Sequence, residues 1–235
     1  MSDSAALDSF LDKWRTRWPE WSVAEVFVAP ARRDIAVAWF ALLQEFDDVL
    51  NIAGDPLPAD AKLAWWGEEL RGWAGQRSRH PLGRLLEPVR ADWTSLADAL
   101  PTLVEARAQP VDRHAGVVAL SRYGETVAAV ETGVLGRAPP SRGVIAQTLA
   151  TRLAEAGTAG IPVDHRQGRD DGDAIRAWAA SLLEQWTPRE GARERRLLSA
   201  YAHGRLRRLA RRGEPAALPS RAALLFTGWR AARGD

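Results

Sequence analysis

Four polar side chains in one segment have types and a spacing that suit metal chemistry. They are Gln44, Asp47, Asp48 and Asn51. They stand at positions i, i+3, i+4 and i+7, so on a helix they share one face. Carboxylate and amide oxygens are the ligands that Mg²⁺ prefers, but exposed aspartate pairs are also common on helix surfaces. The pattern predicts either a magnesium site on Asp47 and Asp48 or a face that only meets water.

The helix that carries this face is predicted for residues 31–52. Its apolar residues recur at spacings of three and four and form a wide stripe. These residues are Ile35, Trp39, Leu42, Leu43, Phe46, Val49 and Leu50. A wide apolar stripe is typical of a helix that packs against a protein core.

The same helical pattern extends over nearly the whole chain, with prolines at helix starts and connections. We expect helices at 4–17, 31–52, 59–77, 81–99, 111–136, 141–157, 171–186, 190–212 and 219–233. Residues 160–173 are the most loop-like stretch. No run of alternating β-branched residues is long enough to predict a sheet. The sequence therefore predicts an all-α protein with one domain over residues 1–235.

Composition excludes several classes of site. The chain is 46% apolar and 26% charged, as in ordinary globular proteins, and it has no cysteine for disulfides or thiolate metal sites. The histidines are His80, His114, His165 and His203, and their spacings fit no compact metal motif. No glycine-rich phosphate loop, serine nucleophile elbow or nucleotide-binding fingerprint is present. The acidic start of the chain resembles no signal peptide, and no stretch is long and apolar enough for a membrane span. We expect a cytoplasmic protein.

Tryptophan and arginine are unevenly placed. Eleven tryptophans suggest a large apolar cavity or interface. Helical spacing predicts that Trp66, Leu70 and Trp73 are buried, whereas Trp65 lines a cavity or contacts a second helix. Glu68 and Glu69 are expected to be solvated acids, and His80-Pro81 is expected to begin a helix rather than to form a catalytic centre.

The segment 189–212 carries a dense run of arginines. Nine arginines lie between Arg189 and Gly213, against two glutamates. Such a run is either a solvated helix face or a contact for phosphate or anionic lipid. Aromatic residues other than Tyr201 are absent from it, so sequence-specific nucleic-acid binding is not expected. The leucines and tyrosine of the segment could form the core face of the same helix; these are Leu197, Leu198, Tyr201, Leu206 and Leu209.

Several motifs, taken in order, are similar to those of one enzyme family. Residues 39–51, WFALLQEFDDVLN, resemble the first aspartate-rich helix of squalene and phytoene synthases. Residues 62–70, KLAWWGEEL, and the following His80-Pro81 resemble a helix pair typical of one branch. Residues 123–136 resemble the family's Y-x-x-x-V-A-x-x-V-G segment. The arginine-rich C-terminal segment is similar to the C-terminal helices of the family branch that contains a mitochondrial complex I assembly factor.

This resemblance implies an isoprenoid-synthase-like bundle of helices around a central cavity. In active members, two aspartate-rich motifs bind Mg²⁺, which holds the diphosphates of two prenyl substrates. Asp47 and Asp48 are then the expected catalytic residues and metal ligands. The residues expected to contact a substrate are Gln44, Asn51, Trp65, Tyr123 and Arg152.

Two departures from the family pattern affect the expected chemistry. Asn51 replaces the third acid of the first motif, and Gln44 stands where active members often have arginine. The second motif, expected near the end of the helix at 143–157, is missing, and Glu155 is the only acid there. Fewer carboxylates leave a magnesium cluster without ligands and charge balance.

Three hypotheses follow. The first is a degenerate family member with weakened or lost prenyl coupling, which acts as a ligand-binding or assembly-type partner protein. Its ligand is a prenyl diphosphate or another apolar molecule, and a peripheral contact with the inner membrane is compatible with it. The second is a Mg²⁺-dependent prenyl-diphosphate transferase, for head-to-head condensation, that uses Asp47 and Asp48. The third is an anionic-surface binding module that uses the segment 189–212.

Overall fold

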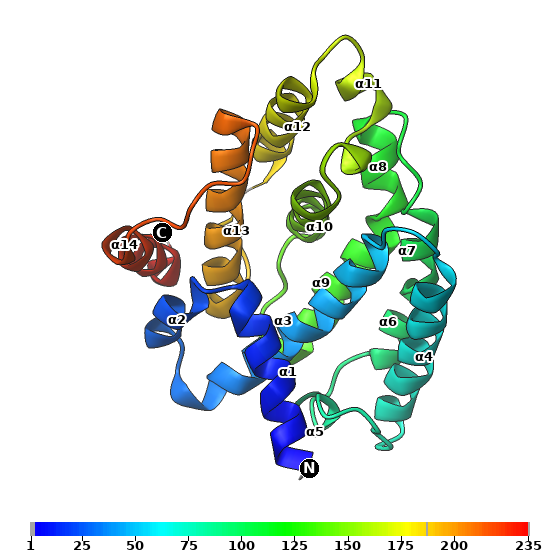
Figure 1. Cartoon of the computed structure of the whole chain (residues 1–235). Helices are drawn as coiled ribbons and strands as arrows, with labels where there is room; N and C mark the ends of the chain where they lie inside the picture. Colours follow the sequence, from blue (N-terminus) through cyan, green and yellow to red (C-terminus); the bar gives the residue numbers. More distant parts are fainter. Residues whose placement is uncertain (1–2, 187, 235) are drawn as a thin grey trace.

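Helices form every regular element in residues 3–186 and 188–234, the ranges that this computed structural model describes, and these ranges contain no strand (Figure 1). The α-helices are α1 (Asp3–Arg17), α2 (Trp21–Ala24), α3 (Pro30–Leu50), α4 (Leu57–Ala74), α5 (Gly83–Leu86), α6 (Trp93–Ala99), α7 (Pro101–Glu105), α8 (Arg113–Ala119), α9 (Ser121–Leu135), α10 (Ser141–Ala156), α11 (Val163–Arg166), α12 (Asp171–Gln185), α13 (Arg193–Arg212) and α14 (Arg221–Arg233). Two 3₁₀ turns are η1 (Glu25–Phe27) and η2 (Gly157–Gly160). The all-α prediction is confirmed. None of the described helices is long and apolar enough to cross a bilayer.

α3 is the central helix, and it is buried on nearly every side. It begins with Pro30 as its first residue, and every side chain from Ala36 to Phe46 is buried, including Gln44 and Glu45. α1 covers one side of α3 in Figure 1, while α4, α9 and α10 also pack against it. On the polar face of α3, Gln44 is buried, whereas Asp47, Asp48 and Asn51 are half-buried. This face therefore contacts protein and also remains partly open to solvent.

Two segments expected as single helices are each broken in two. Residues 81–99 form α5 and α6, with Pro88 between them and with Asp92 as the cap of α6; its carboxylate accepts from the backbone N of Ser95 at 2.9 Å. Residues 111–136 form α8 and α9, which meet at Leu120. The helical periodicity continues through both breaks, so periodicity alone did not reveal them.

Glu69 is a structural acid, which corrects the expectation that it is solvated. Its side chain is fully buried and accepts hydrogen bonds from the backbone N of Arg79 (2.6 Å), the backbone N of His80 (2.7 Å) and Nε1 of Trp73 (2.8 Å). Burial raises the pKa of Glu69, but these hydrogen bonds to the carboxylate outweigh burial, and the net pKa is lowered. The acid fixes the turn in which His80-Pro81 precedes α5, as the sequence predicts.

Most tryptophans pack in the core. Nine of the eleven are buried, among them Trp66 and Trp73, and Leu70 is buried as predicted. Trp65 is 38% exposed and lies against the rings of Trp66 and His80. The tryptophan content of this chain is thus explained mainly by core packing.

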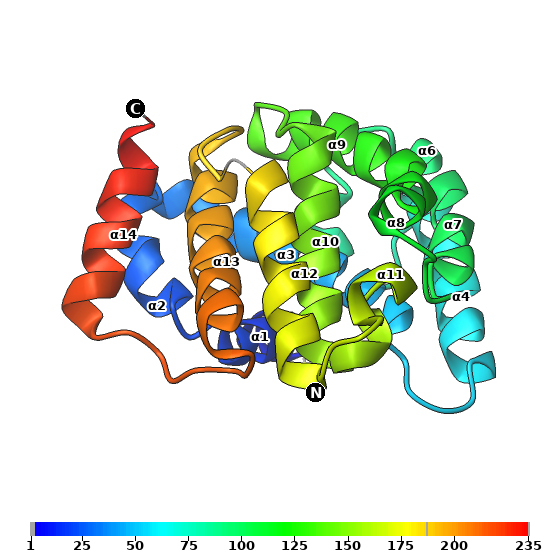
Figure 2. The same cartoon turned by 90° about the horizontal axis from the view of Figure 1, so that it is seen from above.

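One buried ion pair connects four helices. Arg195 of α13 is bound by both carboxylate oxygens of Glu131 of α9, each 2.9 Å from its Nε. Trp39 of α3 donates from Nε1 to the same carboxylate at 2.7 Å, and Arg195 donates from Nη1 to Oε1 of Gln147 of α10 at 3.3 Å. Figure 2 shows α13, α12, α10 and α9 as neighbouring helices. The side chains of Arg195 and Glu131 are 3% and 0% exposed, so each charge depends on the other.

We expect Arg195→Met to lower the free energy of unfolding by about 3–5 kcal/mol, because it leaves the Glu131 carboxylate buried without its partner. Urea denaturation followed by tryptophan fluorescence measures this. Arg142→Met is the matched control, since Arg142 and Glu190 are 65% and 45% exposed, and it should cost about 0–1 kcal/mol. Equal losses in the two variants would contradict the central role of the buried pair.

Candidate functional site

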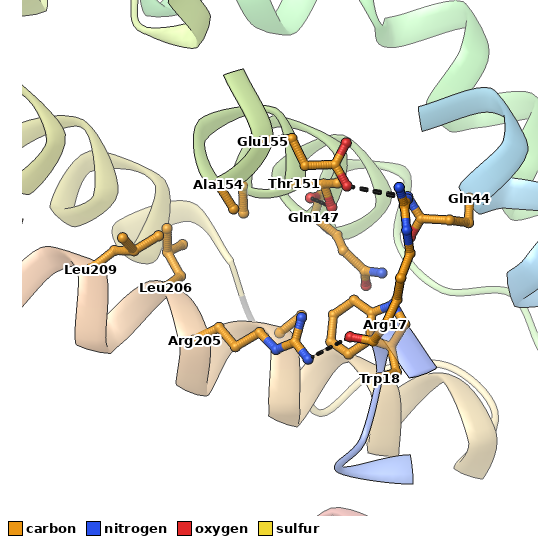
Figure 3. A pocket seen from close by; sticks show the side chains of 12 residues that line it. Arg17, Trp18, Gln44, Gln147, Thr151, Ala154, Glu155, Arg205, Leu206 and Leu209 are labelled. Carbon is orange, nitrogen blue, oxygen red and sulfur yellow. Dashed lines mark hydrogen bonds and ion pairs between the residues drawn. The ribbon is translucent and has the colours of Figure 1, made fainter. Parts of the chain in front are cut away.

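A cavity of about 400 Å³ lies between α1, α3, α10 and α13. One part of its wall is polar and another is apolar, as Figure 3 shows, with Arg17, Gln44 and Glu155 facing one another and Leu206 and Leu209 apart from them. Further lining residues are Trp18, Gln147, Ala150, Thr151, Ala154, Ala202 and Arg205. We call this cavity the central pocket.

Arg17, the last residue of α1, is the cation at the polar edge of the central pocket. Its guanidinium forms an ion pair with Asp48 of α3, and its Nη1 lies 3.5 Å from Oε1 of Glu155 of α10. The side chains of Arg17, Asp48 and Glu155 are 41%, 20% and 32% exposed, so the group lies at the mouth of the pocket. One guanidinium therefore links three helices.

Two amides complete this group. Nε2 of Gln44 donates to Oδ1 of Asp48 at 3.0 Å and to Oε1 of Glu155 at 3.4 Å. Nδ2 of Asn51, the residue that follows α3, donates to Oε2 of Glu155 at 3.2 Å. The Glu155 carboxylate thus receives three donors. Burial raises its pKa above the ordinary value, with a further increase from Asp48, against the opposing charge of Arg17.

Asp47, the residue directly before Asp48, faces a second and smaller cavity. It lines a small cavity of about 20 Å³ together with Trp14, Trp18 and Phe40, which is room for about one water molecule. Burial raises the pKa of Asp47 well above its ordinary value, and the charges of Glu155 and Asp48 raise it further. Burial, followed by the charge of Asp47, also raises the pKa of Tyr123. This arrangement favours the protonated form of Asp47.

The structure brings together only some of the residues predicted for the site. Gln44 and Asn51 join Asp48 at the polar edge, and Asp47 faces the small cavity next to the central pocket. Trp65 and Arg152 do not line the central pocket. Arg152 instead donates to the backbone O of Leu50 (3.4 Å) and to that of Arg107, and burial lowers its pKa.

Comparison with known proteins gives the family. The model of the squalene/phytoene synthase family matches residues 21–138, half of the chain. The chain belongs to the squalene/phytoene synthase family. The match includes the Asp47-Asp48 pair and ends before α10 begins.

Other comparisons add little to this assignment. No curated protein matches. Among solved structures, the crystal structure of squalene synthase HpnC from Alicyclobacillus acidocaldarius is similar, with 18% identity and a TM-score of 0.49 over 98% of this chain and 91% of that one.

Magnesium, which the family generally uses, does not fit the residues of this site. Within residues 3–186 and 188–234, no three acids or histidines are grouped so that they could hold a metal ion. Asp48 and Glu155 already bind the Arg17 guanidinium, and both carboxylate oxygens of Glu155 accept hydrogen bonds. The oxygen ligands at the cleft are therefore already engaged by the Arg17 guanidinium and by the amides of Gln44 and Asn51.

Arg17 and Arg205 are site residues that sequence reasoning missed. Arg205 of α13 donates to both oxygens of the buried Glu20 (2.8 and 2.6 Å) and to the backbone O of Arg17 (2.9 Å). Its guanidinium lies 4.0 Å from the ring centroid of Trp18, in a cation–π contact. These partners are more than 180 positions apart, and no local pattern could have paired them.

We expect Asp47→Asn to stabilise the protein above about pH 4 and to have little effect below it. An unfolded aspartate has a pKa of about 3.9, whereas the folded pKa of Asp47 is raised. Between these values the folded state keeps a proton that the unfolded state has lost, so wild-type stability falls by up to about 1.4 kcal/mol per pH unit as the pH rises.

Urea denaturation at pH 4 and pH 7 tests this. Asparagine removes the titration, so the advantage of the variant should grow between the two pH values. Asp48→Asn is the matched control, and it should destabilise at pH 7 because it weakens the contact with Arg17. A constant difference between Asp47→Asn and wild type at both pH values would show that the prediction is wrong.

Proposed function

We propose that this protein is a degenerate squalene/phytoene synthase family member that has lost or greatly weakened prenyl coupling. It acts as a ligand-binding or assembly-type partner protein through the central pocket and its surface. The observation that carries this proposal is the position of Arg17, which binds Asp48 and Glu155 at the point where α3 and α10 face each other. A positive side chain there takes up the carboxylates that a metal would need.

The energetic consequence is large. Departure of a diphosphate in this family depends on Lewis-acid assistance by a metal, and α10 contributes one acid, Glu155, where a pair is expected. If each missing charge-assisted contact is worth roughly 1.5–3 kcal/mol, two of them reduce binding or rate by a factor of roughly a hundred to tens of thousands. Efficient head-to-head condensation by Asp47 and Asp48 does not agree with such a loss.

The central pocket suits an amphipathic ligand. Its volume of about 400 Å³ is within the range of small-molecule sites. Leu206, Leu209 and three alanines offer an apolar wall, while Arg17, Gln44 and Gln147 offer hydrogen-bond donors. A prenyl diphosphate or another apolar molecule with a polar end could bind there with the metal absent.

The direct test is an activity assay. Purified protein with Mg²⁺ and farnesyl or geranylgeranyl diphosphate should form no coupled hydrocarbon above background, while an active family member forms it in the same assay. Formation of a coupled hydrocarbon, abolished by Asp47→Ala, would overturn this proposal and restore the transferase hypothesis.

A second candidate function, an anionic-surface binding module, has one observation in its favour. A groove of about 820 Å³ between α13 and α14 is lined by arginines and by exposed aromatic rings, with no acid among the lining residues. Phe226 and Trp229 are 58% and 45% exposed and stacked, and Arg207 and Arg230 line the same groove. Figure 2 shows α14 at one end of the molecule, beside α13. Aromatic rings with arginines suit the headgroup region of an anionic membrane.

For this second candidate function, only part of the segment 189–212 could contact a membrane. Arg195 and Arg205 of that segment form ion pairs with buried acids, and Arg196 donates to the backbone O of Ala231 and Ala232. The predicted core face of the segment is buried. The membrane contact proposed here therefore depends on Arg207 together with α14, and it would give the protein a peripheral location at the inner membrane.

We expect binding to vesicles with anionic lipid, little binding to zwitterionic vesicles, and weaker binding as salt increases. Arg207→Ala and Arg230→Ala should each weaken binding about fivefold, because each basic residue near the surface is worth about 1 kcal/mol. Co-sedimentation measures this, with the exposed Arg142→Ala as control. Equal binding by all variants, or binding that ignores salt, would exclude this candidate.

A further inference from the structure

The charged side chains that line the central pocket are Arg17, Glu155 and Arg205, and each of them has a partner of opposite charge. Arg17 is shared between Asp48 and Glu155. Arg205 donates to both carboxylate oxygens of Glu20, at 2.8 and 2.6 Å. Two guanidiniums therefore face three carboxylates, and the described residues of this wall offer no surplus of positive charge.

Arg205 is also fixed by contacts that an incoming anion would have to break. Its Nη2 donates to the backbone O of Arg17 at 2.9 Å, and its guanidinium lies 4.0 Å from the ring centroid of Trp18. The side chain of Glu20 is 2% exposed, so moving Arg205 toward a ligand would leave a buried carboxylate without its partner. The charge of Arg205 therefore serves the fold and not a ligand.

The polar groups of the wall that remain for a ligand are uncharged, and they belong to Gln147 and Thr151 of α10 (Figure 3). Oε1 of Gln147 accepts from Nη1 of Arg195 at 3.3 Å and from Oγ of Ser199 at 3.4 Å, which orients the amide. Its Nε2 donates to no group in the described part of the chain. The Thr151 hydroxyl, one turn further along α10, donates to the backbone O of Gln147 at 3.1 Å and can still accept a hydrogen bond. One amide donor and one hydroxyl acceptor match a single hydroxyl or carbonyl group of a ligand.

The rest of the wall is mainly apolar, and it sets the size of the ligand. Ala150, Ala202, Leu206 and Leu209 are buried and line the pocket together with Trp18. An apolar cavity of about 150 Å³ can hold benzene, so the volume of about 400 Å³ found here gives room for roughly fifteen heavy atoms. Removing that much apolar surface from water would be the main favourable contribution to binding.

We propose that the central pocket binds an uncharged apolar molecule of roughly fifteen heavy atoms with one hydroxyl or carbonyl group, and that it discriminates against the diphosphate of the same chain. A diphosphate would bring several negative charges to a wall where carboxylates outnumber guanidiniums, and no free cation there would offset its lost hydration. An alcohol or ketone has far less hydration to lose. This inference deepens the proposed function and rests on it, because it selects the uncharged class from the ligands that the pocket could hold.

The experiment is calorimetric titration of the full chain with farnesol and with farnesyl diphosphate, which share the same prenyl chain, in EDTA and again in MgCl₂. Farnesol should bind roughly tenfold or more tightly than the diphosphate in both solutions, because only the diphosphate has to bury unpaired charge. Equal affinities, tighter binding of the diphosphate in either solution, or binding of neither molecule would overturn the proposal.

Two variants locate the bound molecule. Ala150→Phe places a ring in the cavity and should weaken farnesol binding about tenfold, whereas Ala64→Phe, at an exposed position of α4, should leave it unchanged. Thr151→Val keeps the shape of the side chain and removes its hydroxyl, and it should weaken farnesol binding about fivefold. If Ala150→Phe does not fold, Thr151→Val decides the question. Unchanged farnesol binding in a folded form of either pocket variant would overturn the assignment.

The charge argument has its own test in the double variant Asp48→Asn, Glu155→Gln. This variant removes both carboxylates that contact Arg17, so that two guanidiniums then face Glu20 alone. Its affinity for farnesyl diphosphate should rise about tenfold, while its affinity for farnesol stays within about twofold of wild type. An unchanged preference between the two molecules would show that charge does not select the ligand.

A matched control removes the same charge elsewhere. Arg71 contacts two carboxylates as Arg17 does, those of Glu68 at 3.3 Å and Asp98 at 2.7 Å, and it does not line the pocket. Glu68→Gln with Asp98→Asn should therefore change neither affinity. An equal gain of diphosphate affinity in this control would assign the effect to net charge and overturn the role of the pocket wall.

These titrations measure binding and not turnover, so their failure can be told apart from failure of the proposed function. A protein that lacks turnover but prefers the diphosphate overturns the ligand class alone. A protein that forms a coupled hydrocarbon overturns both.

Discussion

The buried pair of Arg195 and Glu131 is the constraint on which the rest of this structure depends. A carboxylate and a guanidinium placed in a dry core are costly unless each satisfies the other. The pair is completed by Trp39 and Gln147, so the relative positions of α3, α9, α10 and α13 are fixed by a few hydrogen bonds. Three of these helices, α3, α10 and α13, form the walls of the central pocket together with α1. Its shape is therefore set by a charge-pairing requirement as well as by apolar packing.

Arginine is used in the same way around the pocket. Arg205 satisfies Glu20 and holds the end of α1, and Arg17 satisfies Asp48 and Glu155. The planar guanidinium can bind two acceptors at once, which a lysine ammonium does with less directional control. In this family member, arginine side chains stand among the acids of the cleft. This explains how acidic residues of the first motif can be present in a site that does not fit a magnesium cluster.

Sequence reasoning predicted the features that depend on local patterns. The all-α class, the long helices, the burial of Trp66 and Trp73, and the grouping of Gln44, Asp48 and Asn51 follow from the spacing of residues within individual helices. The breaks inside 81–99 and 111–136 were missed because the apolar residues keep a helical spacing through both segments. The chain nevertheless begins a new helix at the Asp92 cap, and α8 ends at Ala119.

The charge pairs between residues far apart in the sequence could not be predicted from local sequence patterns. Arg17 meets Glu155 across 138 positions, and Arg195 meets Glu131 across 64. A run of arginines in the sequence does not reveal which of them face water and which satisfy buried acids. Glu69 was misjudged for the same reason, because its donors are backbone groups of a turn that only the fold brings to it.

The most direct test of this account is calorimetric titration of the wild-type protein with a non-hydrolysable farnesyl diphosphate analogue, with Mg²⁺ and with EDTA. The central claim is that the protein supplies its own cation and needs no metal, so the heat and the affinity should be the same in both conditions. Tight binding that appears only with Mg²⁺ and disappears in Asp47→Ala would contradict the claim and identify a working metal site.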